Sequence, residues 1–212
     1  MSHLNNEIKS MFIHVPRCGG SSMETLSWNY GSGHYTLSDF YLNQKLDLNE
    51  YYKWTFVRNP WDRIVSCYLA DPDNLYISSF SKFVEILHSK KHLFPKNEIS
   101  WSKSIDVEPI KYLIHFMPMH LMLKIDRKIC IDFIGRFENL EEDWILLQNN
   151  LSLEPQPLPY FNRGREKLQI DYSKFYNQYL IDLVGEIYEE DIKLFNYKNP
   201  IIYGPKENVK KP

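Results

Sequence analysis

The stretch FIHVPRCGGSSMETL, Phe12–Leu26, decides the fold of this chain. The apolar run Met11–Val15 is typical of a buried strand, and it stops at Pro16. Gly19 and Gly20 then permit a tight turn, and the serines that follow them can begin a helix. A strand, a glycine turn and a helix in this order predict an α/β fold with a ligand site at the turn.

The turn has the chemistry of an anion cradle. Backbone N–H groups at a helix start carry the positive end of the helix dipole, and glycines let a ligand approach the backbone closely. Arg17 adds a permanent positive charge, and Ser21 and Ser22 add hydroxyl donors. The stretch therefore predicts a phosphate or sulfate site, with an ordinary strand-to-helix turn as the alternative.

A second junction of the same kind lies in TFVRNPWDRIVSCY, residues 55–68. Lys53–Arg58 has the β-branched and aromatic residues of a strand, and the Asn-Pro pair after it favours a helix start. Arg58 then lies at the strand end, with Ser66 two turns into the helix. Both side chains can reach one phosphate at the carboxyl ends of a parallel sheet, so this junction predicts a second anion contact.

The remaining elements complete an α/β pattern. Length and composition suit one domain over residues 1–212. The patterns predict a helix within 79–91, a third strand at Ile129–Phe137, a helix capped by Asn139 and a long helix over 173–195. Strands that alternate with helices predict three αβα layers around a central parallel sheet. Residues 204–212 are expected to form a flexible tail.

Composition excludes several classes of protein. A formal net charge of −2 provides no global basic field, so no nucleic-acid partner is expected. Three widely spaced cysteines without a CxxC pattern predict neither a disulfide framework nor a metal site. The chain shows no signal peptide and no apolar run of membrane-spanning length. We therefore expect a cytoplasmic protein with no integral membrane segment.

Two other chemistries of a glycine-rich loop fail on the residues. A nucleotide-hydrolysing P-loop requires GxxxxGK[ST], a string that the chain does not contain. A cysteine phosphatase would use Cys18 as a thiolate and an arginine six residues later, but Glu24 occupies that position and would repel a dianionic substrate. A cradle for a phosphosulfate meets neither obstacle and needs no metal.

Four strings resemble the sulfotransferase family, in its carbohydrate-type branch with bacterial members: VPRCGGSSM, FVRNPWDRIVSCY, DFIGRFENLEEDW and YEEDIKLFNY. The resemblance runs from about residue 11 to residue 197, nearly the whole chain. The resemblance implies a P-loop-NTPase-like sulfotransferase fold. It also implies an enzyme that transfers a sulfuryl group from 3′-phosphoadenylyl sulfate (PAPS) to a hydroxyl acceptor, without a metal. The products would be a sulfated acceptor and adenosine 3′,5′-bisphosphate (PAP).

The resemblance also implies which residues bind PAPS. The phosphosulfate would be held by the first loop, which consists of Arg17, Cys18, Gly19, Gly20, Ser21 and Ser22. The 3′-phosphate would be held by Arg58 and Ser66, and by a late basic segment formed by Arg163, Gly164 and Arg165. Many relatives carry lysine where this chain has Arg17. Because arginine does not release a proton at neutral pH, Arg17 is expected to act on the reaction through its charge.

Two histidines are candidates for the general base that removes the acceptor proton. GHYTLSDF, residues 33–40, resembles the segment that carries the base in uronyl 2-O-type relatives, which favours His34. HFMPMH, residues 115–120, resembles a His-aromatic-x-Pro-Gln string of bacterial members, with Met119 in place of the glutamine. His115 is therefore the alternative base or an acceptor contact. His14, in the strand that leads to the cradle, is expected to pack in the core.

The acceptor is the least defined part of the prediction. The family branch implies a carbohydrate hydroxyl, and no single residue specifies it, so a lipid, a peptide tyrosine or a small-metabolite alcohol stays open as the acceptor. Residues 71–128 are irregular and rich in aromatic residues, so we expect them to cover the acceptor cleft. Two alternatives are kept: a P-loop nucleotide kinase, against which the missing GK[ST] string argues, and a non-catalytic PAPS-binding module. No feature of the sequence indicates an oligomeric state.

Overall fold

The computed structural model describes residues 4–24, 34–44, 47–70, 77, 79–94, 113–158 and 171–200. The predicted basic segment Arg163–Arg165 and the predicted tail over 204–212 lie outside these ranges.

A four-stranded sheet forms the centre of the molecule. Its strands lie in the order β1 (Leu4–Asn5), β2 (Ser10–Phe12), β3 (Tyr52–Val57) and β6 (Phe133–Arg136). β2, β3 and β6 are parallel, so their carboxyl ends meet at one edge of the sheet, whereas β1 is antiparallel to β2. The predicted central parallel sheet is confirmed, and β1 adds an antiparallel strand at its edge.

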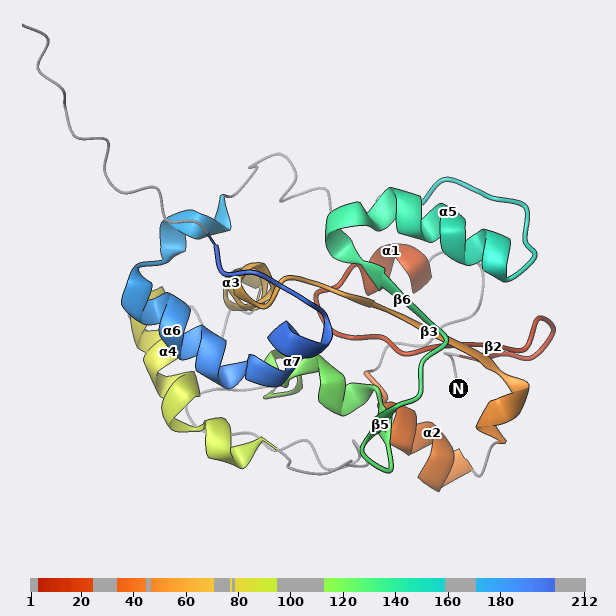
Figure 1. Ribbon diagram of the computed structural model, residues 1–212, viewed down its shortest axis with the longest axis horizontal. Coiled ribbons are helices and arrows are strands. Elements are labelled where there is room, and N and C mark those ends of the chain that lie inside the picture. Colours follow the sequence, from red (N-terminus) through yellow and green to blue (C-terminus); the bar gives the residue numbers. More distant parts are fainter. Residues whose placement is uncertain are drawn as a thin grey trace, which may run out of the picture.

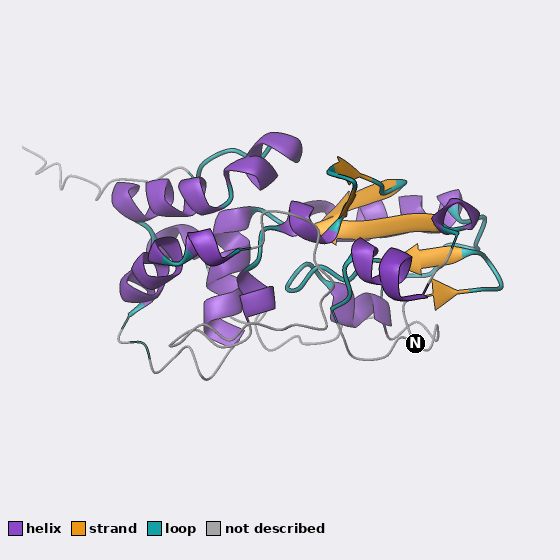
Figure 2. Ribbon diagram, turned by 90° about the horizontal axis from the view of Figure 1, so that it is seen from below, coloured by secondary structure: helices purple, strands orange, loops and turns teal. Residues whose placement is uncertain are grey.

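Helices cover both faces of the sheet. Helices α1 (Gly20–Glu24) and α5 (Leu140–Asn150) lie on one face, and α2 (Leu37–Gln44) lies on the other (Figures 1 and 2). The central strand β3 is buried between these layers, where Trp54 packs against Trp144 of α5 with a ring-centroid distance of 6.2 Å. The arrangement agrees with the predicted αβα architecture.

A group of helices extends beyond the carboxyl edge of the sheet. Helix α3 (Pro60–Ala70) follows β3, and α4 (Phe80–Ser89) and α6 (Gln178–Ile187) lie on the side of α3 away from the sheet (Figure 1). Trp61 of α3 is fully buried and donates from Nε1 to the carbonyl of Ile181 at 3.1 Å. This packing fixes α3, and with it every side chain that α3 directs toward the carboxyl edge.

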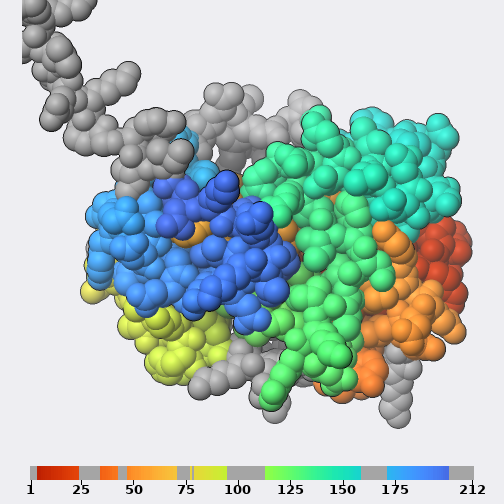
Figure 3. Space-filling view, in the orientation of Figure 1, coloured from red at the N-terminus to blue at the C-terminus, as the bar shows by residue number. Residues whose placement is uncertain are grey.

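The carboxyl-terminal helix α7 (Glu189–Leu194) packs against the 3-10 turn η5 (Met119–Met122). In Figure 3 the blue α7 lies against the green part of the chain that includes η5. The contact brings the last helix to the residues that follow His115.

The predicted third strand, Ile129–Phe137, is divided in the structure. Its first residue belongs to β5 (Lys128–Ile129), which pairs with β4 (Lys124–Ile125) in a separate hairpin. The hairpin closes through Asp126 and Arg127, which have φ angles of 48° and 64°. β6 contains only Phe133–Arg136. A continuous apolar pattern does not reveal this change of sheet.

The predicted long helix over 173–195 is also divided. The structure has a 3-10 turn at Tyr172–Phe175, then α6 and α7, with Tyr188 between the two helices at φ −112° and ψ 25°. Asn177 begins α6, because its side chain accepts a hydrogen bond from the N–H of Leu180 at 2.9 Å. Apolar spacing identified the buried face and missed both breaks.

Candidate active site

The first loop is a strand–turn–helix junction, as predicted. Ile13 still donates to the carbonyl of Trp54 at 2.9 Å, and the turn ends where α1 begins at Gly20. Arg17 has φ 67° and Gly19 has φ 90°, in the left-handed region that favours glycine. The turn therefore holds a non-glycine residue, Arg17, in a strained backbone conformation at its start.

Gly20 is required by close packing as well as by the turn. A Cβ placed on Gly20 would lie 2.1 Å from Nε2 of His14. The His14 ring is buried and stacks on Phe12 at 5.4 Å. The prediction that His14 packs in the core is confirmed, and its ring lies directly against the first residue of α1.

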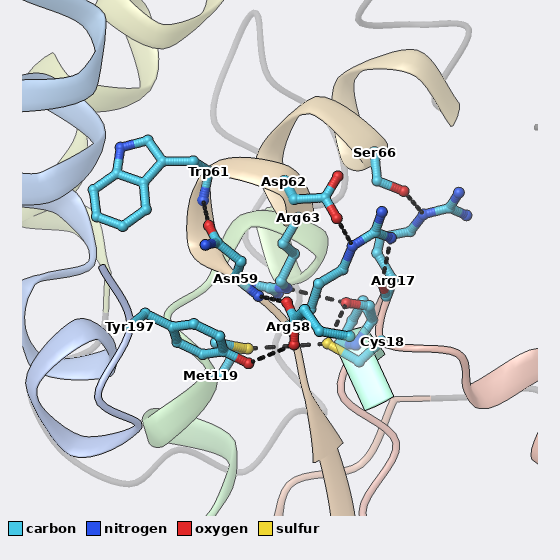
Figure 4. Close-up of polar contacts among 12 residues, drawn as sticks. Arg17, Cys18, Arg58, Asn59, Trp61, Asp62, Arg63, Ser66, Met119 and Tyr197 are labelled. Carbon is cyan, nitrogen blue, oxygen red and sulfur yellow. Dashed lines mark hydrogen bonds and ion pairs between the residues drawn. The ribbon is translucent and has the colours of Figure 1, made fainter. Parts of the chain in front are cut away.

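The two predicted junctions meet in space. Arg58 donates from Nη1 to the carbonyl of Arg17 at 3.0 Å, and Arg17 donates from Nε to Oγ of Ser66 at 3.3 Å (Figure 4). Arg17, Arg58 and Ser66 therefore belong to one site at the carboxyl ends of β2 and β3.

The two arginines give this site a local positive charge. Asp62 accepts from Nε of Arg58 at 2.7 Å, and the guanidinium carbon of Arg58 lies 3.9 Å from the centroid of the Phe137 ring. Burial lowers the pKa of Arg17, and the nearby charge of Arg58 lowers it further. A bound anion would offset the repulsion between the two cations, so the arrangement suits a phosphate or a sulfate.

Glu138 is a residue of this region whose role the sequence did not reveal. Its Oε1 accepts the backbone N–H of Asn59 at 2.5 Å, and its Oε2 accepts the Tyr197 hydroxyl at 3.1 Å. In the sequence Glu138 directly precedes Asn139, the cap of a predicted helix. In the structure it ties the end of β3, beside Arg58, to the carboxyl-terminal part of the chain.

The Cys18 thiol points into the core. Sγ lies 3.6 Å from the carbonyl oxygen of Pro16 and 3.9 Å from Sδ of Met119, and burial raises the pKa of the Cys18 thiol to about 12. A thiol with this pKa stays protonated at neutral pH. This is a second argument, after Glu24, against Cys18 as the nucleophile of a cysteine phosphatase. Cys18 has only its backbone available to the cradle. Met119 is fully buried and does not present its side chain to solvent.

Three imidazoles lie in a row beside the cradle. The His34 ring meets the His14 ring edge-on at 4.5 Å and the His115 ring at 5.2 Å. Nδ1 of His34 lies 3.3 Å from the carbonyl oxygen of His14. Because a carbonyl only accepts, this contact places a proton on Nδ1, and in the neutral ring Nε2 then carries the lone pair. The structure thus brings both candidate bases together next to the first loop.

Arg63 is a second residue that the sequence did not single out. Its side chain is only 1% exposed, and its guanidinium donates to the carbonyls of Pro16, His115 and Met117 at 3.0, 3.0 and 2.9 Å. Helix α3 has apolar residues on nearly all of its sides. This pattern is visible in the sequence, and it indicates that a charged residue within the helix is buried.

Two features are absent from the described part of the chain. Residues 4–24, 34–44, 47–70, 77, 79–94, 113–158 and 171–200 contain no group of three or more His, Cys, Asp or Glu side chains that could hold a metal. Within these ranges no helix has the length and apolar character needed to cross a membrane.

Comparison with known proteins agrees with this geometry. The sequence model of the sulfotransferase family matches residues 5–198. Human carbohydrate sulfotransferase 9 is 24% identical in an alignment of 241 positions that covers 94% of this chain and 54% of the relative. The chain thus spans about half the length of the curated relative it matches. No solved structure matches. The carbohydrate-type branch of the predicted resemblance has its support in this relative. The resemblance to the sulfotransferase family is confirmed, and the chain belongs to that family.

Proposed function

We propose that this protein transfers a sulfuryl group from PAPS to a hydroxyl group of an acceptor. The observation that carries the proposal is the meeting of Arg17, Arg58 and Ser66 at the carboxyl ends of two neighbouring parallel strands. Ligands of open α/β sheets bind at this edge. Membership of the sulfotransferase family supports sulfuryl transfer as the reaction.

The donor assignment follows the charges of the site. We assign the phosphosulfate to the backbone and hydroxyl groups of the first loop with Arg17, and the 3′-phosphate to Arg58 and Ser66. Arg163–Arg165 are assigned to the 3′-phosphate by the family resemblance alone. Guanidinium groups and N–H donors fit a nucleotide with two anionic ends, because arginine binds such oxygens through paired, charged hydrogen bonds. PAPS would supply the sulfuryl group that is transferred.

We assign the general base to His34. In the tautomer that donates from Nδ1 to the His14 carbonyl, Nε2 carries the lone pair that a general base needs. Arg17 would stabilise the negative charge that develops on the leaving oxygen. His115 lies against His34 and is assigned as an acceptor contact, with the role of base as its alternative. Most of the rate enhancement would then come from positioning and charge, as in phosphoryl transfer.

The acceptor class rests on the named relative. Because that relative is described as a carbohydrate sulfotransferase, we propose a carbohydrate hydroxyl as the acceptor. The expectation that residues 71–128 cover the acceptor cleft stays a prediction, because the structure describes only residues 77, 79–94 and 113–128 of that range. Location in the cytoplasm stays a prediction.

Calorimetry with PAP tests the donor site. We expect binding that is unchanged by EDTA, and an affinity about 10- to 100-fold lower for Arg58→Ala, because hydrogen bonds to charged groups contribute about 1.5–3 kcal/mol. Lys82→Ala, on the exposed side of α4, is the matched control and should bind as the wild type does. A strict requirement for Mg-ATP instead would favour the nucleotide-kinase alternative.

Sulfate transfer from labelled PAPS to a panel of glycans tests the reaction. An enzyme should label at least one glycan in a time-dependent way, and labelling should stop when PAPS is omitted. Tight PAP binding without transfer to any glycan, lipid or phenolic acceptor would support the non-catalytic binding module.

A further inference from the structure

The segment His115–His120, called here the His115 segment, is held in place by side chains. It contains the end of the 3-10 turn Leu113–Phe116 and the start of the 3-10 turn Met119–Met122, with Met117 and Pro118 between them, so few of its backbone groups pair within a helix. Tyr188 donates from its hydroxyl to the carbonyl of Phe116 at 2.6 Å. The Asp191 carboxylate accepts the N–H groups of Met119 and His120 at 2.7 and 2.8 Å. These bonds attach the segment to the carboxyl-terminal helices.

Arg63 attaches the same segment to the donor cradle. Its Nη1 and Nη2 donate to the carbonyls of Met117 and His115, while its Nε donates to the carbonyl of Pro16. Pro16 immediately precedes Arg17, where the cradle begins. Two thiols also contact the segment: Cys67 of α3 donates from Sγ to the carbonyl of His115 at 3.0 Å, and Sγ of Cys18 lies 3.9 Å from Sδ of Met119. The Arg63 guanidinium joins the backbone just before the cradle to the backbone of His115 and Met117 by charged hydrogen bonds, and so helps to set the distance between the cradle and His115.

A buried cation that holds two segments together through carbonyl partners carries a large desolvation free energy. Removing a guanidinium from water is costly, and apolar side chains in such places often stabilise a protein as well or better. The planar fork of arginine offers donors in fixed, diverging directions, which an apolar residue or a lysine cannot reproduce. The three donor directions of Arg63 match three carbonyls from two separate segments.

We infer that Arg63 is a positioning residue, which holds His115, and through it the neighbouring His34 ring, at the correct distance from the donor cradle. The His115 and His34 rings are 5.2 Å apart, so a shift of the His115 backbone moves the environment of the candidate base. A misplacement of about 1 Å costs on the order of 10²-fold in rate for in-line transfer. The expected effect of Arg63 on the rate rests on the proposed function. Its expected effect on the positions of His115 and His34 rests on the structure alone.

The kinetic test compares Arg63→Lys with Tyr188→Phe. Arg63→Lys keeps a cation but loses the fork, so we expect a fall in kcat of about 30- to 100-fold, with PAP affinity within about 3-fold of the wild type. Tyr188→Phe removes one hydrogen bond to the same segment without touching the cradle. It should lower the melting temperature and leave kcat within about 3-fold. Equal losses of kcat in both variants, or parallel losses of kcat and PAP affinity in Arg63→Lys, would overturn the inference.

A spectroscopic readout separates this inference from the proposed function. In histidine-labelled protein without donor, Arg63→Lys should shift the imidazole NMR signals of His115 and His34 and leave that of His88 unchanged. Unchanged His115 and His34 signals would overturn the inference, whatever the activity. If these signals move but the wild type neither binds PAP nor transfers sulfate, the proposed function fails and the positioning role stands. Arg63→Gln is the second variant, and failure of both variants to fold would assign Arg63 to folding alone.

Discussion

Replacing His34 with alanine is expected to lower the rate of sulfuryl transfer by about 10²–10⁴-fold, the usual contribution of a positioned general base. PAP affinity should stay close to that of the wild type, because the groups assigned to the nucleotide lie on the first loop and on Arg58 and Ser66. The measurement combines transfer from labelled PAPS, calorimetry with PAP and a thermal melt. The split between lost turnover and retained binding is the signature of a residue that acts on the acceptor proton.

Two histidine variants serve as controls for His34→Ala. His88 lies on α4 and pairs with Glu186 at 2.7 Å, away from the cradle, so His88→Ala should transfer sulfate at the wild-type rate. His115→Ala should raise the KM for the acceptor if His115 contacts the acceptor, and abolish turnover if His115 is the base. Full activity in His34→Ala, or equal loss of PAP binding and transfer, contradicts the assignment of the base to His34.

Replacing Gly20 with alanine is expected to destabilise the fold and remove PAP binding together. The added methyl would lie 2.1 Å from the buried His14 ring, which cannot move away because Phe12 and His34 contact it. Overpacking of this kind costs about 1–3 kcal/mol in the free energy of unfolding. The same shift would displace the start of α1, where the phosphosulfate is assigned. Chemical denaturation and calorimetry with PAP measure the two effects.

Gly185→Ala is the matched control for Gly20→Ala. Gly185 lies within α6, and a Cβ there would have its nearest neighbour at 3.8 Å, an ordinary van der Waals contact. Alanine at this position should stabilise the protein by about 0.5–1 kcal/mol. The double variant His14→Ala with Gly20→Ala removes the clashing ring and should be destabilised less than the two single changes add up to. A Gly20→Ala protein as stable as the wild type would show that the His14 contact does not constrain the cradle.

Much of the site could be predicted from the sequence, because each of its parts is a local pattern. Arg17 and the glycines follow a strand and precede a helix, and Arg58 and Ser66 flank a second helix start. Such spacings are set by neighbouring residues, and the family resemblance rests on the same strings. The predicted Ile129–Phe137 strand was wrong in its first half, because the pairing of that half depends on a partner strand and not on a local pattern. A tight turn at Asp126 and Arg127 returns the chain to β4, and a run of apolar residues does not encode that partner.

What the sequence by itself determined for this protein is the position of its two candidate anion-binding loops between strand and helix, and the family to which it belongs. What required the folded chain is the relation between distant residues. Arg17 meets Ser66 across 49 positions, and Arg58 meets the Arg17 carbonyl across 41. The row formed by His14, His34 and His115, and the buried Arg63 behind it, arise in the same way. A strand or a turn depends on contacts between near neighbours, whereas these meetings depend on how sheet and helices pack, which no short stretch of sequence contains.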